Sequence, residues 1–203
     1  MKFDIILTGV GGEGVLTSGV VIARAAALER YYVRGVQPHG LAQRGGAIST
    51  CIRFGSKEEV SSPETMQANA DLVIAFEPLE AVRAVHYARK QKTHFVINKH
   101  PYVPVYADLL NLPYPKMNKI IKIIKPFAKK IHVFNAYNLA KKKFGKIIFG
   151  NMILIGYCFG LGLIPLKKRS MLESIKITAP RELEENLKSF DLGLEAGKKS
   201  IKV

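Results

Sequence analysis

The chain has 203 residues, and its 31 Lys and Arg against 16 Asp and Glu give a formal net charge of +15. Nearly half of the residues are apolar, which excludes a disordered chain, and the length suits one α/β domain with its own core. Cys51 and Cys158 are far apart and form no metal-ligand spacing, so we predict two small core residues and no metal site.

The opening residues are typical of a strand, a tight turn and a helix. Residues 3–8 form a short β-branched apolar run, and residues 15–30 read as a helix with few breakers. A Gly-x-Gly-x-x-Gly turn joins them, in which the backbone can approach a ligand and the helix N-terminus presents free N–H groups to an anion. The glycines of this turn are Gly9, Gly11, Gly12 and Gly14.

A dinucleotide site would need an acidic residue about twenty positions further on, at the end of a second strand. Residues 31–36 fit that strand, but Gln-Pro-His follows it, and Glu29 belongs to the preceding helix. Two alternatives stay open on the glycines alone. One is a nicotinamide-dependent reductase that uses Arg34 with NADP, and the other is a turn that only packs a helix on a strand.

Residues 39–46 read His-Gly-Leu-Ala-Gln-Arg-Gly-Gly and precede a predicted strand at residues 47–54. This mixture of an imidazole, an amide, a guanidinium and three glycines indicates a binding loop. Arg44 is the expected anion contact, because its planar fork suits a carboxylate or phosphate. Gln43 and His39 are expected to position the substrate, and His39 is also a candidate for proton transfer.

The apolar strand at residues 71–76 should bring Glu77 to the C-terminal edge of a parallel sheet, where α/β proteins bind ligands. Pro78 then begins a helix that runs to about residue 90. Glu77 is therefore either the N-cap of this helix or part of the site. The next predicted strand, residues 93–97, precedes His100, which we expect to be a solvated turn residue.

Residues 101–115 hold four prolines and predict an irregular crossing, with at most a short strand near residues 103–106. Lysines are dense over residues 116–146, and residues 116–125 form a basic amphipathic helix. This charge suits a solvated face, a docking surface for an acidic redox partner, or a basic nucleic-acid-binding or scaffold module. No nucleic-acid recognition motif accompanies it, so nucleic acid is not the expected partner.

Residues 131–134 read as the last sheet strand, followed by a short helix. The apolar stretch at residues 147–163 is short and glycine-rich for a membrane span, so we predict a buried core or interface helix and no membrane partner. Gly156 and Gly160 would let another element approach this helix closely. Asn151 on it is either a buried amide or a residue turned toward the site. Two charged helices complete the chain.

The expected architecture is a three-layer α/β/α Rossmann-like domain with a mostly parallel sheet. It should span residues 1–203 as one domain, with C-terminal helices from about residue 146. The first residues lead directly into a strand and show no secretory signal, so a cytoplasmic location is expected.

These motifs in this order resemble the gamma-type domain of the 2-oxoacid:ferredoxin oxidoreductases, and within it the small (beta) subunits of the indolepyruvate-type enzymes. The resemblance is densest over residues 3–84. Position 13 is Glu where the family often has Gln. The segments that carry the resemblance are residues 9–14, 39–46, Ser62-Pro63, Ala70-Asp71, residues 77–80 and residues 149–156.

The resemblance implies a subunit, inactive alone, of an enzyme that oxidatively decarboxylates a 2-oxoacid to acyl-CoA and CO₂ and reduces ferredoxin. Thiamine diphosphate and iron–sulfur clusters would belong to a large (alpha) partner subunit, because this chain lacks the cysteines, and coenzyme A would be a co-substrate. A stand-alone NAD(P)-binding reductase and a basic nucleic-acid-binding module remain the rival functions. The residues expected to bind cofactor or line the site are Gly9, Gly11, Gly12, Gly14, Gly45, Gly46, Glu77 and Asn151.

Overall fold

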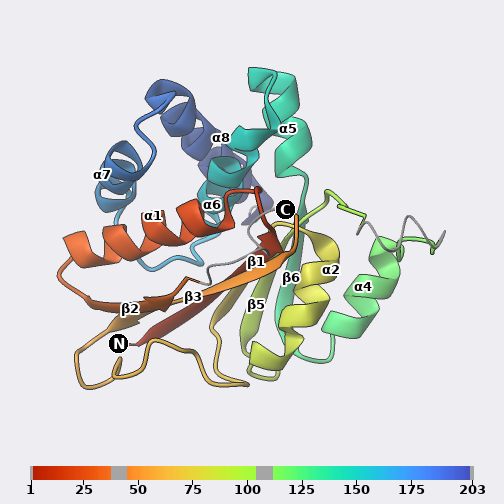
Figure 1. The fold of residues 1–203 in the computed structure, drawn as a ribbon, viewed down its shortest axis with the longest axis horizontal. Helices are drawn as coiled ribbons and strands as arrows, with labels where there is room; N and C mark the ends of the chain where they lie inside the picture. Colours follow the sequence, from red (N-terminus) through yellow and green to blue (C-terminus); the bar gives the residue numbers. More distant parts are fainter. Residues whose placement is uncertain (1, 38–44, 104–111, 202–203) are drawn as a thin grey trace.

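A six-stranded sheet forms the middle layer of the computed structural model, which describes residues 2–37, 45–103 and 112–201 (Figure 1). Its strand order is β2-β3-β1-β4-β5-β6. Helices cover both faces, so the predicted three-layer α/β/α class is confirmed. The strands are β1 (Phe3–Val10), β2 (Tyr32–Val36), β3 (Ala47–Gly55), β4 (Leu72–Ala75), β5 (Thr93–Asn98) and β6 (Ala128–Phe134).

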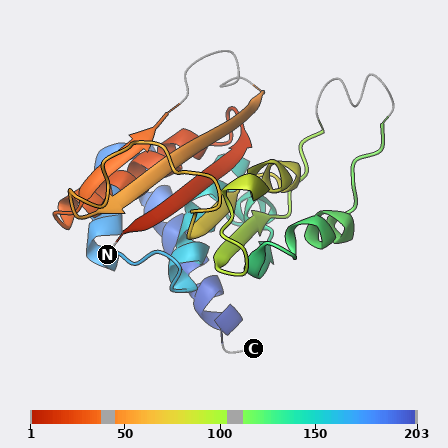
Figure 2. The same cartoon turned by 90° about the horizontal axis from the view of Figure 1, so that it is seen from below.

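The strands β1, β4, β5 and β6 are mutually parallel, whereas β3 runs antiparallel to both of its neighbours, β1 and β2. The register pairs Phe3 with Phe54 and Val10 with Ala47, so β3 begins at the edge of the sheet where β1 ends. Seen from below, β3 and β1 lie side by side along their length (Figure 2). The connection from β2 to β3 therefore starts and finishes at the C-terminal edge of the parallel strands.

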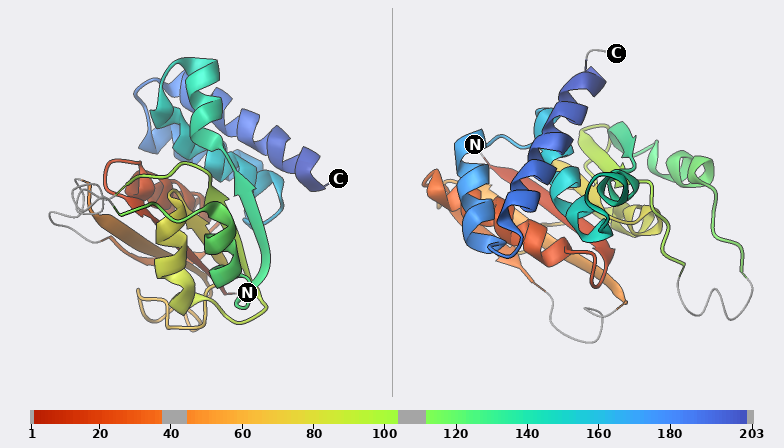
Figure 3. Two further views of the ribbon diagram at one scale, coloured as in Figure 1. Left: turned by 90° about the vertical axis from the view of Figure 1, so that its right-hand side faces the viewer. Right: turned by 90° about the horizontal axis from the view of Figure 1, so that it is seen from above.

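Five helices cover one face of the sheet and two cover the other (Figures 1 and 3). The larger layer packs on Ile5, Leu7 and Ile74, and the smaller one on Ile6 and Val73, because alternate strand residues point to opposite faces. The first group is α1 (Val15–Leu28), α5 (Ala136–Phe144), α6 (Gly150–Gly160), α7 (Lys168–Thr178) and α8 (Leu183–Ile201), and the second is α2 (Pro78–Arg83) and α4 (Met117–Ile124).

The helix predicted to reach residue 90 ends earlier. After α2 a 3₁₀ turn, η2 (Ala84–Tyr87), takes over, and the following chain forms a bridge between Ala88 and Ala70. The amides of Ala68 and Asn69 donate to the carbonyls of the last two η2 residues at 2.9 and 3.0 Å. These long-range hydrogen bonds replace the hydrogen bonds that would continue the helix. The local sequence does not predict them.

The strand β6 begins three residues earlier than predicted, because Ala128 and Lys130 pair with the start of β5. Lys129 and Lys130 are both exposed, so the apolar alternation that marks a half-buried strand is missing there. Val103 lies outside any strand, and the rest of the short strand predicted near residues 103–106 falls outside the described residues.

The apolar stretch at residues 147–163 folds as η3 (Ile147–Phe149) and the buried helix α6, as predicted. It crosses α8 at very short range. A Cβ atom added to Gly156 would stand 2.1 Å from the carbonyl oxygen of Phe190, and one on Gly193 would stand 2.0 Å from that of Ile153. The predicted close approach is confirmed, and its partner is α8. No helix among the described residues is long and apolar enough to cross a membrane.

Candidate functional site

The glycine-rich turn between β1 and α1 has the backbone conformation that requires glycine at two positions. Gly12 and Gly14 have φ angles of 104° and 79°, in the left-handed region that side chains disfavour. Gly9 is needed for space instead, since a Cβ there would come within 2.8 Å of Phe76. Gly14 is the N-cap of α1, and no side chain caps its first turn. Free N–H groups therefore remain at this helix end.

Gly45 and Gly46 pack directly against this turn. The Gly11 amide donates to the Gly46 carbonyl at 2.8 Å, and the Gly45 amide donates to the Gly11 carbonyl at 3.0 Å. The two glycine-rich segments thus meet at the C-terminal edge of the sheet through these residues. His39, Gln43 and Arg44 lie outside the described residues, so their expected roles stay predictions.

Glu13 contributes a carboxyl group to the turn itself. Its Oε2 accepts a hydrogen bond of 2.7 Å from the Val10 amide, and its carbonyl accepts one of 3.3 Å from the Tyr137 hydroxyl. Burial raises the pKa of Glu13 to about 7. The hydrogen bond from Val10 lowers this pKa in part, and repulsion from the Glu77 carboxylate raises it further. Burial therefore favours the uncharged form of the Glu13 carboxyl group, which has the shape of the glutamine that the resembled family often has at this position.

Glu77 is the N-cap of α2, which confirms one of its two predicted roles. Its Oε2 accepts hydrogen bonds from the amides of Leu79 and Glu80 at 2.7 and 3.0 Å. Its Oε1 accepts one from the Tyr102 amide at 3.2 Å and one from the Tyr114 hydroxyl. With only 1% of its surface exposed, Glu77 fixes both ends of the 102–114 segment to the sheet edge. Its role as a cofactor ligand stays a prediction.

Asn98, the last residue of β5, joins three elements at the same edge. Its amide nitrogen donates to the Phe76 carbonyl after β4, and its amide oxygen accepts from the Ala136 amide at the start of α5, both at 3.0 Å. His100 nearby is half-buried, with its ring 5.1 Å from that of Tyr137. It is thus less solvated than predicted, because α5 packs over it.

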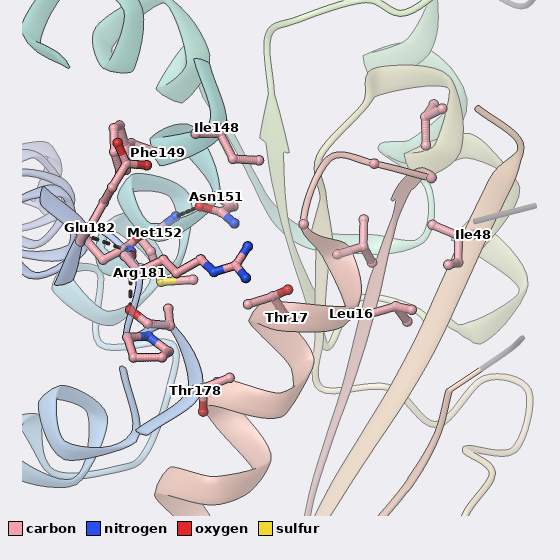
Figure 4. Close-up of a pocket in the computed structure, with 18 residues that line it drawn as sticks. Leu16, Thr17, Ile48, Ile148, Phe149, Asn151, Met152, Thr178, Arg181 and Glu182 are labelled. Carbon is pink, nitrogen blue, oxygen red and sulfur yellow. Dashed lines mark hydrogen bonds between the residues drawn. The ribbon is translucent and has the colours of Figure 1, made fainter. Parts of the chain in front are cut away.

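A cavity of about 620 Å³ opens beside the glycine turn (Figure 4). Its walls are the turn with the first residues of α1, the start of α6, and the connection between α7 and α8. Asn151 lines it and is 6% exposed, with its amide oxygen accepting a 2.7 Å bond from the Met152 amide. A Cβ on Gly14 would come within 2.3 Å of the Asn151 amide nitrogen, so the predicted turn toward the site is observed.

Arg181 is a cavity residue that sequence reasoning missed. Figure 4 shows its side chain reaching across the cavity toward Thr17, with Asn151 alongside. The Asn186 amide nitrogen donates to the carbonyls of Arg181 and Glu182 at 3.0 and 3.2 Å, which holds this turn in place. The only sequence signal was an Ala-Pro break before Arg181, and it does not reveal that the break folds back over the glycine turn.

This set of groups suits an anion. Backbone N–H groups at an uncapped helix N-terminus, an arginine and a side-chain amide converge on one cavity, and no acidic residue stands in the first turn of α1. Glu182 also lines the cavity, but its carboxylate pairs with Lys146. The described residues contain no group of three His, Cys, Asp or Glu that could hold a metal ion. Cys51 and Cys158 are buried and free, as predicted, and burial raises the pKa of both thiols.

Fold and site together define a Rossmann-like α/β protein whose glycine turn opens on a cavity of about 620 Å³. Residues 4–196 match the family model described as pyruvate ferredoxin/flavodoxin oxidoreductase. The chain belongs to this family and is an oxidoreductase subunit.

The relatives agree in length as well as in sequence. Indolepyruvate oxidoreductase subunit IorB of Thermococcus kodakarensis is 33% identical, with 98% of each chain covered. The 2-oxoglutarate synthase subunit KorC of Archaeoglobus fulgidus is 28% identical over 99% of this chain and 91% of its own. The solved gamma subunit of a keto/oxoacid ferredoxin oxidoreductase from Geobacter sulfurreducens has a TM-score of 0.68 at 20% identity, covering 97% and 99% of the two chains.

Proposed function

We propose that this chain is the small subunit of an indolepyruvate oxidoreductase, which oxidatively decarboxylates an arylpyruvate to acyl-CoA and CO₂ and passes the electrons to ferredoxin. The observation that carries the proposal is the higher identity, over essentially whole chains, with the indolepyruvate subunit than with the 2-oxoglutarate subunit. Thiamine diphosphate and iron–sulfur clusters belong to the large partner subunit in this proposal. The two isolated, buried cysteines of this chain do not fit a cluster.

The part assigned to this chain is to complete the partner's site from one side. Gly11 and Gly46 present backbone along the sheet edge, and the cavity beside them takes an anionic group of coenzyme A. Arg181, the Asn151 amide and the free N–H groups of α1 support this assignment. Arg44 is proposed as a second anion contact on the loop that ends at Gly45.

The first experiment purifies the tagged chain from its native extract under anaerobic conditions and identifies what accompanies it. We expect a large thiamine- and cluster-bearing subunit, and viologen reduction that depends on both coenzyme A and indolepyruvate. Faster turnover with 2-oxoglutarate would replace the substrate assignment while keeping the family. A chain recovered alone with tightly bound NAD(P) would favour the reductase alternative.

A second experiment tests the anion site in the assembled enzyme with Arg181→Ala and Arg44→Ala. Loss of a charge-assisted hydrogen bond costs about 1.5–3 kcal/mol, so each variant should raise the KM for coenzyme A roughly 10- to 100-fold without dissociating the complex. Arg169→Ala, at an exposed position of α7, is the matched control. Unchanged kinetics in Arg181→Ala at equal assembly would remove the cavity from the coenzyme A route.

A further inference from the structure

The excess positive charge of this protein comes almost entirely from one part of the chain. Between residues 109 and 172 the sequence holds thirteen Lys and Arg and not one Asp or Glu. The rest of the chain carries the other 18 basic residues and all 16 acidic ones, so it is nearly balanced. A proteome-wide preference for lysine would spread the charge evenly, and it would not remove every acidic residue from a stretch of this length.

Nine of these thirteen residues gather on three neighbouring elements, α4, β6 and α5, and all nine are exposed. We call them the lysine surface. The helices α4 and α5 lie on opposite faces of the sheet, with the edge strand β6 between them, so the lysine surface extends around this edge of the sheet (Figures 1 and 3). None of the nine forms an ion pair with a described residue. The lysine surface consists of Lys116, Lys119, Lys122, Lys125, Lys129, Lys130, Lys141, Lys142 and Lys143.

Several exposed lysines elsewhere in the molecule have acidic partners. Lys146 pairs with Glu182, and Lys168 pairs with Asp191 at 2.6 Å. On the lysine surface the positive charges add instead of cancelling, and their field reaches the neighbouring strands. The pKa of His94 on β5 is lowered by burial and then by Lys129 and Lys130. Such a concentration of one sign attracts and orients a partner of the opposite sign.

The residues between the lysines indicate the kind of contact. Two large apolar side chains emerge among them, Ile123 and Phe127, with 42% and 37% of their surfaces exposed. Stable interfaces are depleted in lysine and have a broad apolar core, whereas brief redox encounters are small and guided by charge. The composition of the lysine surface therefore suits a partner that binds, reacts and leaves, and not a permanent subunit.

We infer that the lysine surface is the docking site for an acidic electron-carrier protein, which it captures and orients beside the redox centres of the assembled enzyme. The carrier would meet α4, β6 and α5 through carboxylates, with Ile123 and Phe127 as a small apolar contact at the centre. The inference rests on the proposed function only in requiring that the chain works inside an electron-delivering complex.

The test uses the purified two-subunit enzyme and an acidic ferredoxin. The triple variant Lys119→Gln, Lys122→Gln, Lys125→Gln removes three charges from α4. At about 0.2–1 kcal/mol for each exposed pair, the KM for ferredoxin should rise roughly 3- to 100-fold at low ionic strength. At about 0.5 M salt, where the screening length is only several Å, the variant and the wild type should converge. Methyl viologen reduction, which needs no docking, should stay unchanged.

A matched triple variant, Lys57→Gln, Lys167→Gln, Arg169→Gln, removes the same charge from exposed positions outside the lysine surface. It should leave the KM for ferredoxin within about twofold of the wild-type value, because charges beyond a screening length contribute little. Equal changes in both triple variants, or no change in either, would overturn the docking site.

Two other outcomes also overturn the inference. If the α4 variant loses the large subunit, the lysine surface is a permanent interface. If it loses salt-dependent binding of a fluorescent oligonucleotide while the KM for ferredoxin stays at the wild-type value, the surface serves nucleic acid. If the wild-type enzyme fails to reduce viologen with every 2-oxoacid tested, the proposed function is contradicted. This outcome is distinguishable from a failure of the docking site, because it is seen without any lysine variant.

Discussion

The chain uses glycine at two places for two opposite purposes. In the turn between β1 and α1, Gly12 and Gly14 have positive φ angles, and the backbone they bend is left open toward a cavity. Where α6 crosses α8, Gly156 and Gly193 are ordinary helical residues, and the missing side chains let two backbones meet. Glycine therefore provides conformation and access in the first region and space in the second.

The contrast shows that a pattern of glycines can be interpreted only when the structure around it is known. A Cβ on Gly12 would meet nothing within 4 Å, whereas one on Gly193 would collide with the backbone of α6. A glycine-to-alanine substitution should thus cost stability through the left-handed backbone at Gly12 and through a collision between helices at Gly193. Three predictions follow this division, beginning with the largest effect.

Gly193→Ala should destabilise the fold by about 3 kcal/mol, at the upper end of overpacking costs, because the atom in the way is a backbone carbonyl that cannot rotate aside. For a chain of this size the melting temperature should fall by about 6–12 °C, measured by calorimetry or circular dichroism. Lys199→Ala, at an exposed position of the same helix, should change stability by less than about 0.5 kcal/mol. A stabilised Gly193→Ala would show that the two helices do not cross so closely.

Glu13→Gln tests the turn through its charge. The folded pKa of about 7 lies above the ordinary value of 4.5, so the folded state binds the proton more tightly than the unfolded state does. Wild-type stability should therefore fall as pH rises from about 4.5 through 7, whereas the glutamine variant should lack this loss. The variant should be more stable by up to about 3 kcal/mol at pH 8 and equal to the wild type at pH 4.5.

The measurement is urea unfolding of both proteins across that pH range. Glu64→Gln, at an exposed carboxylate outside the cavity, serves as the control and should show no such crossover. A constant difference between Glu13→Gln and the wild type at every pH would mean that the carboxyl ionises normally in the folded protein.

Gly14→Ala should cost about 2 kcal/mol, partly from the positive φ and partly from the collision with Asn151. In the double variant with Asn151→Ala the collision is gone, so about 1 kcal/mol should be recovered relative to the sum of the single changes. A double-mutant cycle of unfolding free energies measures this coupling. Strict additivity would place the Asn151 side chain away from the turn in solution.

Most of the architecture could be predicted because most of the strands and helices are encoded locally. The run at residues 3–8, the glycine turn and the apolar strand before Glu77 all appeared near the expected places. What local sequence could not supply was the direction of β3. Its antiparallel pairing with β1 is a long-range choice, and it is this pairing that brings Gly46 to Gly11.

The parts of the candidate site that come from one continuous segment of the chain could be predicted from the sequence. The glycine turn and the N-cap role of Glu77 follow from their positions next to a strand and a helix. Arg181 and Asn98 were missed because their importance comes from partners distant in sequence. Asn98 joins the end of β4 to the start of α5, and Arg181 reaches the cavity because the connection between α7 and α8 lies beside the first residues of α1.

The tight crossing of α6 and α8 has a consequence for the cavity at one end of it. Asn151 lies in the first turn of α6, and the turn carrying Arg181 leads directly into α8. Because the backbones of α6 and α8 are in direct contact, neither helix can move without moving the other, and the two cavity walls beside them move together. A ligand that enters the cavity therefore finds its two polar walls already positioned, and little conformational entropy is lost in arranging them on binding.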